Sequence, residues 1–303
     1  MTIVQNKIVE NRNGSVPTLE KIIQVASWEL KHYSSNRSSW AQSAAAFFLF
    51  LILMVVRNQW GYILGTTAVG QLAELAYNLM LIFGIMLPFL VTDRVAHDYQ
   101  ERMHELLMAT AVPTHVYVLG RYVTTLLISL CLAIVLLVSQ LLVNLILPMV
   151  YTNFPAADPV VTLSLWLRLT LPAGILVGSL CFCLGTLFPR ITAIPKIAMG
   201  IAWIILALDN DPTELMRTGR AYWNPTGAGM ITLAYKQFQD SASNRLKNTL
   251  GAVQRADLIM CLQQSLPDLR PWIGPFLILA VIGLLLGFLT IISFRRFRSV
   301  MNG

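Results

Sequence analysis

The polar residues best suited to chemistry lie in a charged run, residues 93–113, between two long apolar stretches of the sequence. Asp93 can cap the start of a helix there, because its carboxylate can accept from the first free backbone N–H groups. At helical spacing, the apolar residues of the run fall on one side and can pack against the rest of the chain. The other side then points to water and carries Asp98, Glu101, Arg102 and Glu105. A short helix of this kind can dock a partner protein.

No other group of residues predicts catalysis or metal binding. His97, His104 and His115 stand near one another, but the residues around them supply no convincing set of metal ligands. The serines and threonines have no neighbouring His and acid in any arrangement typical of nucleophilic catalysis. A Gly-x-x-x-x-Gly-Lys-Ser/Thr phosphate loop is absent from the sequence, so the chain does not bind ATP by that route. The four cysteines are interpreted as packing residues.

The remainder of the sequence predicts the elements that hold the charged run in place. Of the 303 residues, 56% are hydrophobic and 12% are charged, whereas about a quarter are charged in a typical soluble domain. The apolar residues form runs long enough to cross a hydrocarbon core as helices, which takes about 20 residues. We therefore expect an all-α membrane protein with six transmembrane helices, over residues 39–56, 69–91, 116–147, 161–188, 191–208 and 272–294.

The distribution of Lys and Arg predicts the orientation, because short cytosolic loops retain these residues. With the amino terminus inside, most of them fall in predicted cytosolic segments, and only Arg57 and Arg168 fall in short outer ones. We expect no secretory signal at the start of the chain. Both termini are therefore predicted to be cytosolic, in a plasma membrane or bacterial inner membrane. This asymmetry accounts for the net charge of +7 without nucleic acid as a partner.

The chain divides into four parts on this basis. Residues 1–38 are a cytosolic amino terminus with an interfacial helix, and residues 39–208 hold spans one to five with a cytosolic coupling helix at 93–110. Residues 209–271 form an extracytosolic segment in which Asn224-Pro-Thr-Gly227 predicts a turn. After it we expect two short amphipathic helices that cap the membrane part. Their apolar residues at helical spacing are Met230, Leu233, Ala234 and Phe238 for the first, and Leu246, Leu250, Val253 and Met260 for the second. Residues 272–303 hold span six and the cytosolic carboxyl terminus.

The interfacial helix is predicted from an apolar pattern ahead of the first span. Leu19, Ile22, Ile23, Ala26 and Leu30 recur at helical spacing, with polar residues on the other side. An amphipathic helix that leads directly into a membrane span is expected to lie among the lipid headgroups, with its cations toward lipid phosphates. The alternative is an ordinary helix that packs on a soluble partner.

A few residues within the predicted spans could face a substrate cavity. Glu74 and Asn78 lie one turn apart toward the outer end of the second span, where they either line such a cavity or, as we favour, reach the headgroups. Phe83, Met86 and Trp203 could line an apolar cavity between two protomers. Ordinary packing explains these three residues at least as well.

The charged run and the residues after it resemble a known family. Residues 105–121 carry the sequence Glu-Leu-Leu, then Ala-Thr-Ala-Val and later Leu-Gly-Arg. This is similar to the permease subunits of type-2 ABC exporters, whose segment between spans two and three reads roughly Glu-Arg, Gly-Thr-Leu-Glu, several leucines, Ala-Thr-Pro-Val and Leu-Gly-Lys. The chain departs from the pattern at Arg102 and Met103, where Gly-Thr is usual, and at Ala111, where Pro is usual. The matching residues are Glu105, Leu106, Leu107, Ala109, Thr110, Val112, Leu119, Gly120 and Arg121. Asn224-Pro225 also resembles the Asn-Pro that follows span five in that family.

The resemblance implies a membrane-spanning permease that dimerises with a copy of itself or a related chain. Each protomer would dock a separate ABC ATPase, two copies per complex, with ATP and Mg on the ATPase and no cofactor on this chain. The cargo would be an amphipathic drug, antibiotic, peptide or lipid moved outward. By the family's pattern Glu105 holds the docking helix at the base of the spans, and Glu101 and Arg102 contact the partner unless they are simply solvated. The implied ATPase-coupling residues are Asp98, Glu101, Arg102, His104, Glu105 and Leu106.

The sequence leaves other functions open, and each would require a different structural feature. A polysaccharide exporter of the same family would place aromatic residues along a continuous channel. A multispan membrane enzyme, such as an acyl or glycosyl transferase, would bury a cluster of His, Asp or Glu at one interface. An ion-coupled carrier would need carboxylates deep in its spans, which the sequence does not indicate. A sensor or assembly scaffold would have no ATPase partner.

Overall fold

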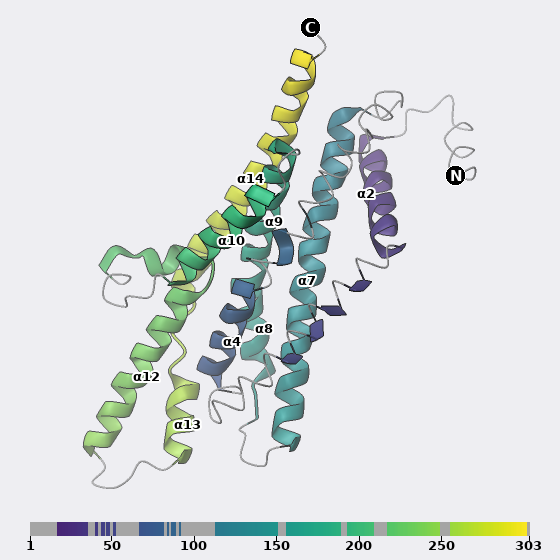
Figure 1. Ribbon diagram of the computed structural model, residues 1–303. Helices are drawn as coiled ribbons and strands as arrows, with labels where there is room; N and C mark the ends of the chain where they lie inside the picture. Colours follow the sequence, from purple (N-terminus) through teal and green to yellow (C-terminus); the bar gives the residue numbers. More distant parts are fainter. Residues whose placement is uncertain are drawn as a thin grey trace.

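The computed structural model describes residues 17–35, 67–81, 113–150, 156–188, 193–208, 217–248 and 255–301, together with single residues between 40 and 52 and between 84 and 91. Every regular element in these ranges is a helix (Figure 1). In chain order they are α2 (Thr18–Ser35), α4 (Ala68–Leu81), α7 (Thr114–Val150), α8 (Pro159–Leu165), the π-helical turn η2 (Trp166–Thr170), α9 (Leu171–Leu187), α10 (Ala193–Leu208), the 3-10 turn η3 (Arg220–Trp223), α12 (Ala228–Asn248), α13 (Arg255–Gln264) and α14 (Arg270–Met301).

Among the described residues, three helical stretches are long and apolar enough to cross a membrane. They cover His115–Val150, Pro159–Leu187 and Arg270–Ser293, and they coincide with the predicted spans three, four and six. The predicted fifth span corresponds to α10, whose apolar part Lys196–Leu206 is shorter. α4 begins the predicted second span, and most of the first lies outside the described residues. The helical fold is as predicted, and the number of six spans stays a prediction.

The second of these stretches is a continuous rod that widens locally at η2. Its start is fixed by Asp158, whose Oδ1 accepts from the Val160 N–H at 2.8 Å. Between α8 and α9 the helix passes through the π-helical turn Trp166–Thr170. Pro172, at the start of α9, has no N–H to donate to the preceding turn, which accounts for the widening.

Small residues let α9 pack closely on both α7 and α14. A Cβ atom on Gly283 of α14 would lie only 2.9 Å from the Cα atom of Leu176 in α9. On the other side of α9, the hydroxyl of Ser129 in α7 donates to the Gly174 carbonyl at 2.7 Å. Close approach through small residues and hydrogen bonds between helices are the interactions that hold apolar helices together where water is absent.

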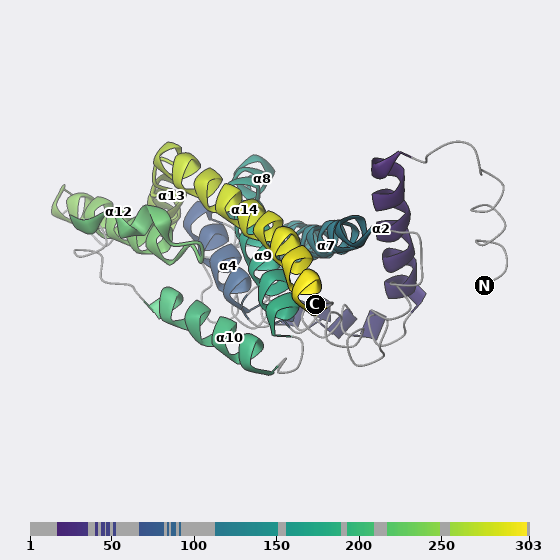
Figure 2. The ribbon, with the colours of Figure 1, turned by 90° about the horizontal axis from the view of Figure 1, so that it is seen from above.

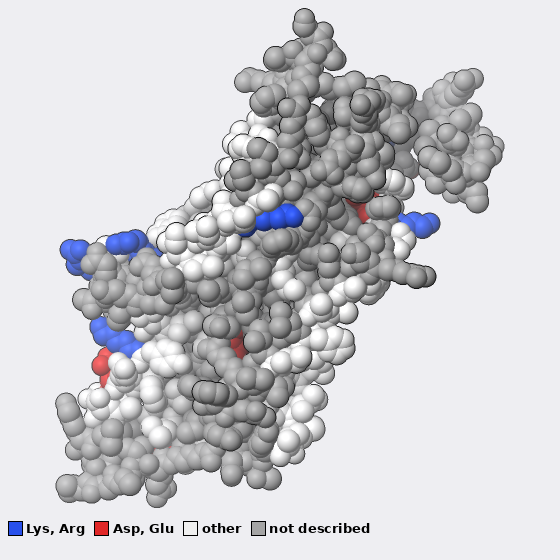
Figure 3. Space-filling view, viewed as in Figure 1, with Lys and Arg blue, Asp and Glu red and all other residues white. Residues whose placement is uncertain are grey.

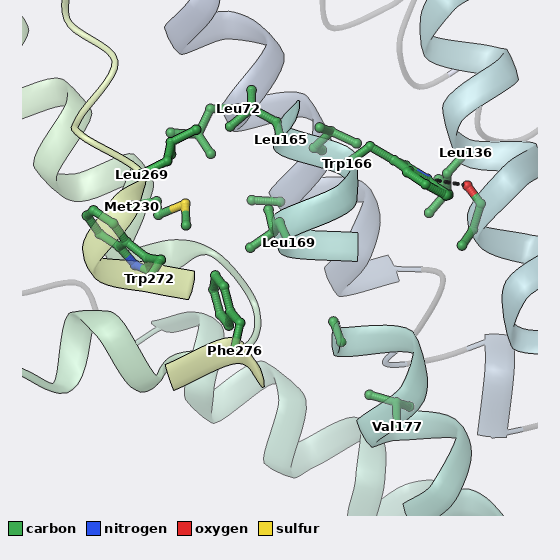
Figure 4. Close-up of a cluster of buried hydrophobic side chains, with 14 of the residues drawn as sticks. Leu72, Leu136, Leu165, Trp166, Leu169, Val177, Met230, Leu269, Trp272 and Phe276 are labelled. Atoms are coloured by element: carbon green, nitrogen blue, oxygen red, sulfur yellow. Dashed lines mark hydrogen bonds between the residues drawn. The ribbon is translucent and has the colours of Figure 1, made fainter. Parts of the chain in front are cut away.

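The hydrophobic core surrounds η2, where side chains from several helices meet (Figure 4). Leu165 and Leu169 point from the widened rod toward α4, α12 and α14. The indole N–H of Trp166 donates to the Ala133 carbonyl of α7 at 2.6 Å, so the same rod is fixed to α7 on its other side. The labelled partners in Figure 4 include Leu72, Met230, Leu269, Trp272 and Phe276.

α2 crosses the N-terminal part of α7 obliquely, as the two ribbon views show (Figures 1 and 2). Ala26 and Glu29 are buried in this contact, whereas Leu19 and Ile23 are 67% and 58% exposed. A helix is therefore present where the sequence predicted an amphipathic one. Its apolar side is divided between α7 and the surface, and its place among lipid headgroups stays a prediction.

In the described part of the predicted extracytosolic segment, α12 and α13 are the two longer helices, and their bounds differ from the sequence pattern. α12 continues to Asn248, so that Leu246, which the pattern assigned to the second helix, belongs to the first. The second helix begins later, at Arg255. Both helices lie beside α4 rather than over the end of the bundle (Figure 1).

The turn that precedes α12 is buried. The Asn224 amide donates to the Leu206 carbonyl of α10 at 2.6 Å, and its side-chain oxygen accepts from the Thr226 N–H at 3.0 Å. Gly227 has a φ of 77°, a conformation that favours glycine, and a Cβ there would lie 3.0 Å from Leu169. The turn predicted from Asn-Pro-Thr-Gly thus joins α10 to α12 inside the molecule.

Exposed apolar side chains form long stripes on the described surface. On α7 the stripe includes Ile134, Val138, Leu141 and Leu145, at helical spacing. A second stripe on α14 includes Leu277, Val281, Leu285 and Phe288. Charged side chains are few on the described part of the face seen in Figure 3. Contiguous apolar surface on this scale fits contact with lipid.

Candidate functional site

A buried ion pair joins α2 to α7. The Arg121 Nε donates to the Glu29 Oε1 at 3.0 Å, and the two side chains are only 12% and 7% exposed. The guanidinium also lies over the ring of Tyr117, 5.0 Å from its centroid. We call this contact the α2–α7 ion pair. A charge buried among apolar side chains is costly unless it is paired and hydrogen-bonded. Separation of the two helices would therefore cost free energy, because each charge would lose its partner.

Gly120, next to Arg121, lets the two helices come close enough for this pair to form. A Cβ atom at Gly120 would lie 2.6 Å from the Val25 Cγ1 and 3.3 Å from the Ile22 carbonyl oxygen of α2. The hydroxyl of Thr124 donates back to the Gly120 carbonyl at 3.0 Å, within α7. Any side chain at position 120 would therefore push α2 away from α7.

A small pocket beside the ion pair connects it to the predicted second span. Its lining residues are Glu29, Val91, Arg121, Thr124, Thr125, Ile128 and Phe182. Val91 is 2% exposed and is the last described residue before the charged run. The described chain resumes at Pro113, and Arg121 follows about two turns into α7. The chain segments before and after the charged run therefore both lead to the α2–α7 ion pair.

This arrangement fits mechanical linkage rather than proton transfer. An arginine guanidinium remains protonated in proteins, so Arg121 cannot act as a base. Its carboxylate partner already accepts a charge-assisted hydrogen bond from it. What the geometry supports is a firm connection, through which a force on the start of α7 would also move α2.

A second buried polar group lies toward the other end of α7. Gln71 and Glu74 of α4, Gln140 and Asn144 of α7, and Thr162 of α8 are each at most 7% exposed. We call these five residues the amide cluster. The favoured sequence interpretation, in which Glu74 reaches lipid headgroups, requires an exposed carboxylate. Glu74 is 4% exposed because α4 is packed against α8, α12 and α13, so it lies inside the protein instead.

Two of the other residues predicted to line a substrate cavity, Trp203 and Met86, have side chains that the structure describes. Trp203 is 3% exposed and lies directly against Gly84, where a Cβ would meet its indole ring. Met86 is half-buried against the same hydrophobic core. Phe83 and the side chain of Asn78 lie outside the described residues. Trp203 and Met86 thus pack within one chain, and a cavity between two protomers stays a prediction.

The predicted ATPase-coupling residues all lie outside the described residues. They are Asp98, Glu101, Arg102, His104, Glu105 and Leu106. Sequence reasoning did not pair Glu29 with Arg121, although a signal was present. Glu29 is one turn from Ala26 on the apolar side of α2, and Arg121 lies inside an apolar span, so both positions invite a buried partner.

Comparison with family models, with curated proteins and with solved structures finds no match for this chain. The likeness to type-2 ABC permeases therefore depends on the motif residues themselves. Of the described ones, Gly120 and Arg121 lie at the contact of α7 with α2. Leu119 packs against the cluster of Val118, Tyr122, Phe182 and Ile291.

Proposed function

We propose that this chain is the membrane-spanning permease subunit of an ATP-driven ABC exporter, which moves an amphipathic substrate outward. A separate ATPase subunit, two copies per complex, supplies ATP and Mg, and a second permease protomer completes the assembly. The three apolar helices long enough to cross a membrane support the transmembrane part of this proposal.

The observation that carries the proposal is the place of the motif residues in the fold. The sequence Leu119-Gly-Arg121 ends the stretch that resembles the permease family. In this chain Gly120 admits α2 against α7, and Arg121 holds it there through Glu29. A motif that follows the predicted docking helix and also fixes the amphipathic helix suits a chain that must pass movement from a docked partner to its spans.

The geometry suggests how that movement would pass. Closure of the ATPases shifts the coupling segment 93–110, which leads directly into α7. α7 is 37 residues long, about 55 Å at 1.5 Å per residue, and an unbroken helix of this length moves largely as one body. α2 follows because the ion pair joins it to α7, and the amide cluster at the far end of α7 is displaced in the same step.

Copurification tests this proposal. The tagged chain is purified gently with its native neighbours, and the copurified protein is assayed for ATPase activity. The double variant Glu101→Lys with Arg102→Glu should lose the ATPase, because it reverses both charges on the predicted docking surface. The matched control is Lys236→Glu with Asp240→Lys, which reverses two exposed charges on α12 and should retain the ATPase.

A well-folded wild-type chain that brings no ATPase would contradict the proposal and favour a membrane enzyme or scaffold. Retention of the ATPase by the Glu101 and Arg102 double variant would leave the transporter class standing but contradict docking through residues 98–107. Equal loss in the α12 control would show that charge reversal in general disrupts the complex.

A further inference from the structure

The amide cluster has hydrogen bonds that fix how its side chains are turned. The Gln140 Nε2 donates to the backbone carbonyl of Gln71 at 3.3 Å. The Asn144 Nδ2 donates to the Thr162 hydroxyl oxygen, also at 3.3 Å. That hydroxyl donates its single proton onward, to the side-chain oxygen of Gln71 or to the Asp158 carbonyl. Thr162 can therefore only accept from Asn144.

These bonds turn both amide oxygens away from their partners. Gln140 must present its NH₂ group to a carbonyl, and Asn144 must present its NH₂ group to the oxygen of Thr162. The Gln140 Oε1 and the Asn144 Oδ1 are left buried without a hydrogen-bond partner among the described residues. A buried acceptor without a partner costs free energy, and a bound ligand with a hydrogen-bond donor would remove this cost.

A carboxylate adds negative charge to this group of acceptors. Glu74 lies one turn from Gln71 on the same face of α4, and it is 4% exposed. Carboxylates buried in apolar helical bundles are rare, and they mark paths for ions or substrates more often than they serve packing. A positively charged group that only donates hydrogen bonds would match one carboxylate and two amide oxygens.

We propose that the amide cluster binds the primary ammonium group of the transported substrate, through Glu74, Gln140 and Asn144. The inference rests on the proposed function, since it names the substrate class as amphipathic amines. A primary ammonium has three N–H donors, one for each of the three acceptor side chains. Buried apolar side chains next to the cluster residues in the sequence, including Leu72, Leu75 and Val143, would contact the substrate's apolar part.

Thermal unfolding of the purified chain tests the site without any ATPase. Methylammonium chloride and tetramethylammonium chloride are compared at equal ionic strength, because they carry the same charge and only methylammonium has N–H donors. We expect methylammonium to raise the unfolding midpoint with an apparent affinity roughly tenfold or more above that of tetramethylammonium, in line with charge-assisted hydrogen bonds. Glu74→Gln and Asn144→Leu should each abolish this difference. Asp240→Asn, which neutralises an exposed carboxylate on α12, should keep it.

Equal stabilisation by methylammonium and tetramethylammonium, or by neither, in the wild-type chain would overturn the proposal without reference to any variant. Stabilisation by sodium chloride equal to that by methylammonium would also overturn it, because the site would then select charge and not N–H donors. The outcome is independent of copurification with an ATPase. An exporter with a different cargo would keep its ATPase and fail this test.

Discussion

The α2–α7 ion pair and the amide cluster lie on the same helix, and both bury polar groups in an apolar bundle. They are separated along α7 by the 19 residues from Arg121 to Gln140, about 29 Å of helix. At the ion pair the buried charges are close and directly bonded, at 3.0 Å. At the amide cluster the hydrogen bonds that Gln140 and Asn144 donate are longer, at 3.3 Å, and the side-chain oxygens of these two residues have no partner among the described residues.

This difference in hydrogen bonding indicates that the ion pair is a structural contact and the amide cluster a binding site. A satisfied buried pair resists any rearrangement, because breaking it leaves a charge without compensation. A partly satisfied polar group is a poor way to stabilise a fold, since its vacant acceptors cost free energy until a ligand fills them. The ion pair is thus suited to transmit movement, and the amide cluster to respond to a ligand at the other end of the same helix.

Arg121→Met should have the largest effect on stability. The change leaves Glu29 buried without its cation, which we expect to cost about 3–5 kcal/mol. The double variant Glu29→Leu with Arg121→Met removes both charges and should recover most of this loss. The free energy of unfolding, from chemical denaturation in detergent, measures both.

Lys31→Met is the matched control, because it removes an exposed cation from α2. Its effect should be within about 0.5 kcal/mol. An Arg121→Met variant as stable as this control would mean that the ion pair does not hold α2, and the comparison between the two regions would fail.

Gly120→Ala should have the next largest effect. The added Cβ would overlap Val25 of α2, and overpacking of this kind costs typically 1–3 kcal/mol. Val25→Ala in the same chain should restore part of the stability by making room. Gly274→Ala on α14 adds a methyl where no atom lies within 4 Å, and it should be neutral. The rate of trypsin cleavage at Lys21 and Lys31 measures how closely α2 is held against α7. Cleavage should be faster in the Gly120→Ala variant and unchanged in the Gly274→Ala variant.

The long apolar helices could be predicted from the sequence because length and composition alone decide them. The pattern placed spans at 116–147, 161–188 and 272–294, and the structure has helices at His115–Val150, Pro159–Leu187 and Arg270–Ser293. The π-helical turn at Trp166–Thr170 was not predicted, since it depends on one missing N–H at Pro172 and on packing around it. The bounds of α12 and α13 were also shifted, because their apolar periodicity is weak.

The candidate site was harder to predict, because it depends on which helices become neighbours. The apolar pattern of α2 did not show that Glu29 would meet Arg121, 92 residues away. Glu74 was assigned to the headgroups because its place in the span is near one end. Contact of α4 with α8, α12 and α13 buries it instead. Tertiary packing decided both cases.

Thr162→Val tests the hydrogen bonds inside the amide cluster. The change keeps the side chain's shape but removes the hydroxyl that accepts from Asn144 and donates to Gln71 or Asp158. Hydrogen bonds between helices in membranes contribute modestly, so we expect a loss of about 1–2 kcal/mol in the free energy of unfolding. Ser164→Ala, on the same helix, removes a hydroxyl that bonds only within α8, and it should cost less. A Thr162→Val variant with no loss would show that these bonds do not organise the cluster.

Asn144→Leu should have the smallest effect on stability, within about 1 kcal/mol. The change removes one long hydrogen bond, which lowers stability, and one buried oxygen without a partner among the described residues, which raises it. The apolar side chain that replaces them has a similar size. The same variant should lose stabilisation by methylammonium, so a change at Asn144 would remove ligand binding and keep the free energy of unfolding. A change at Arg121 would lower the free energy of unfolding even with no ligand present. If Asn144→Leu cost as much as Arg121→Met in ligand-free buffer, the amide cluster would be a structural contact like the ion pair, and its vacant acceptors would not indicate a binding site.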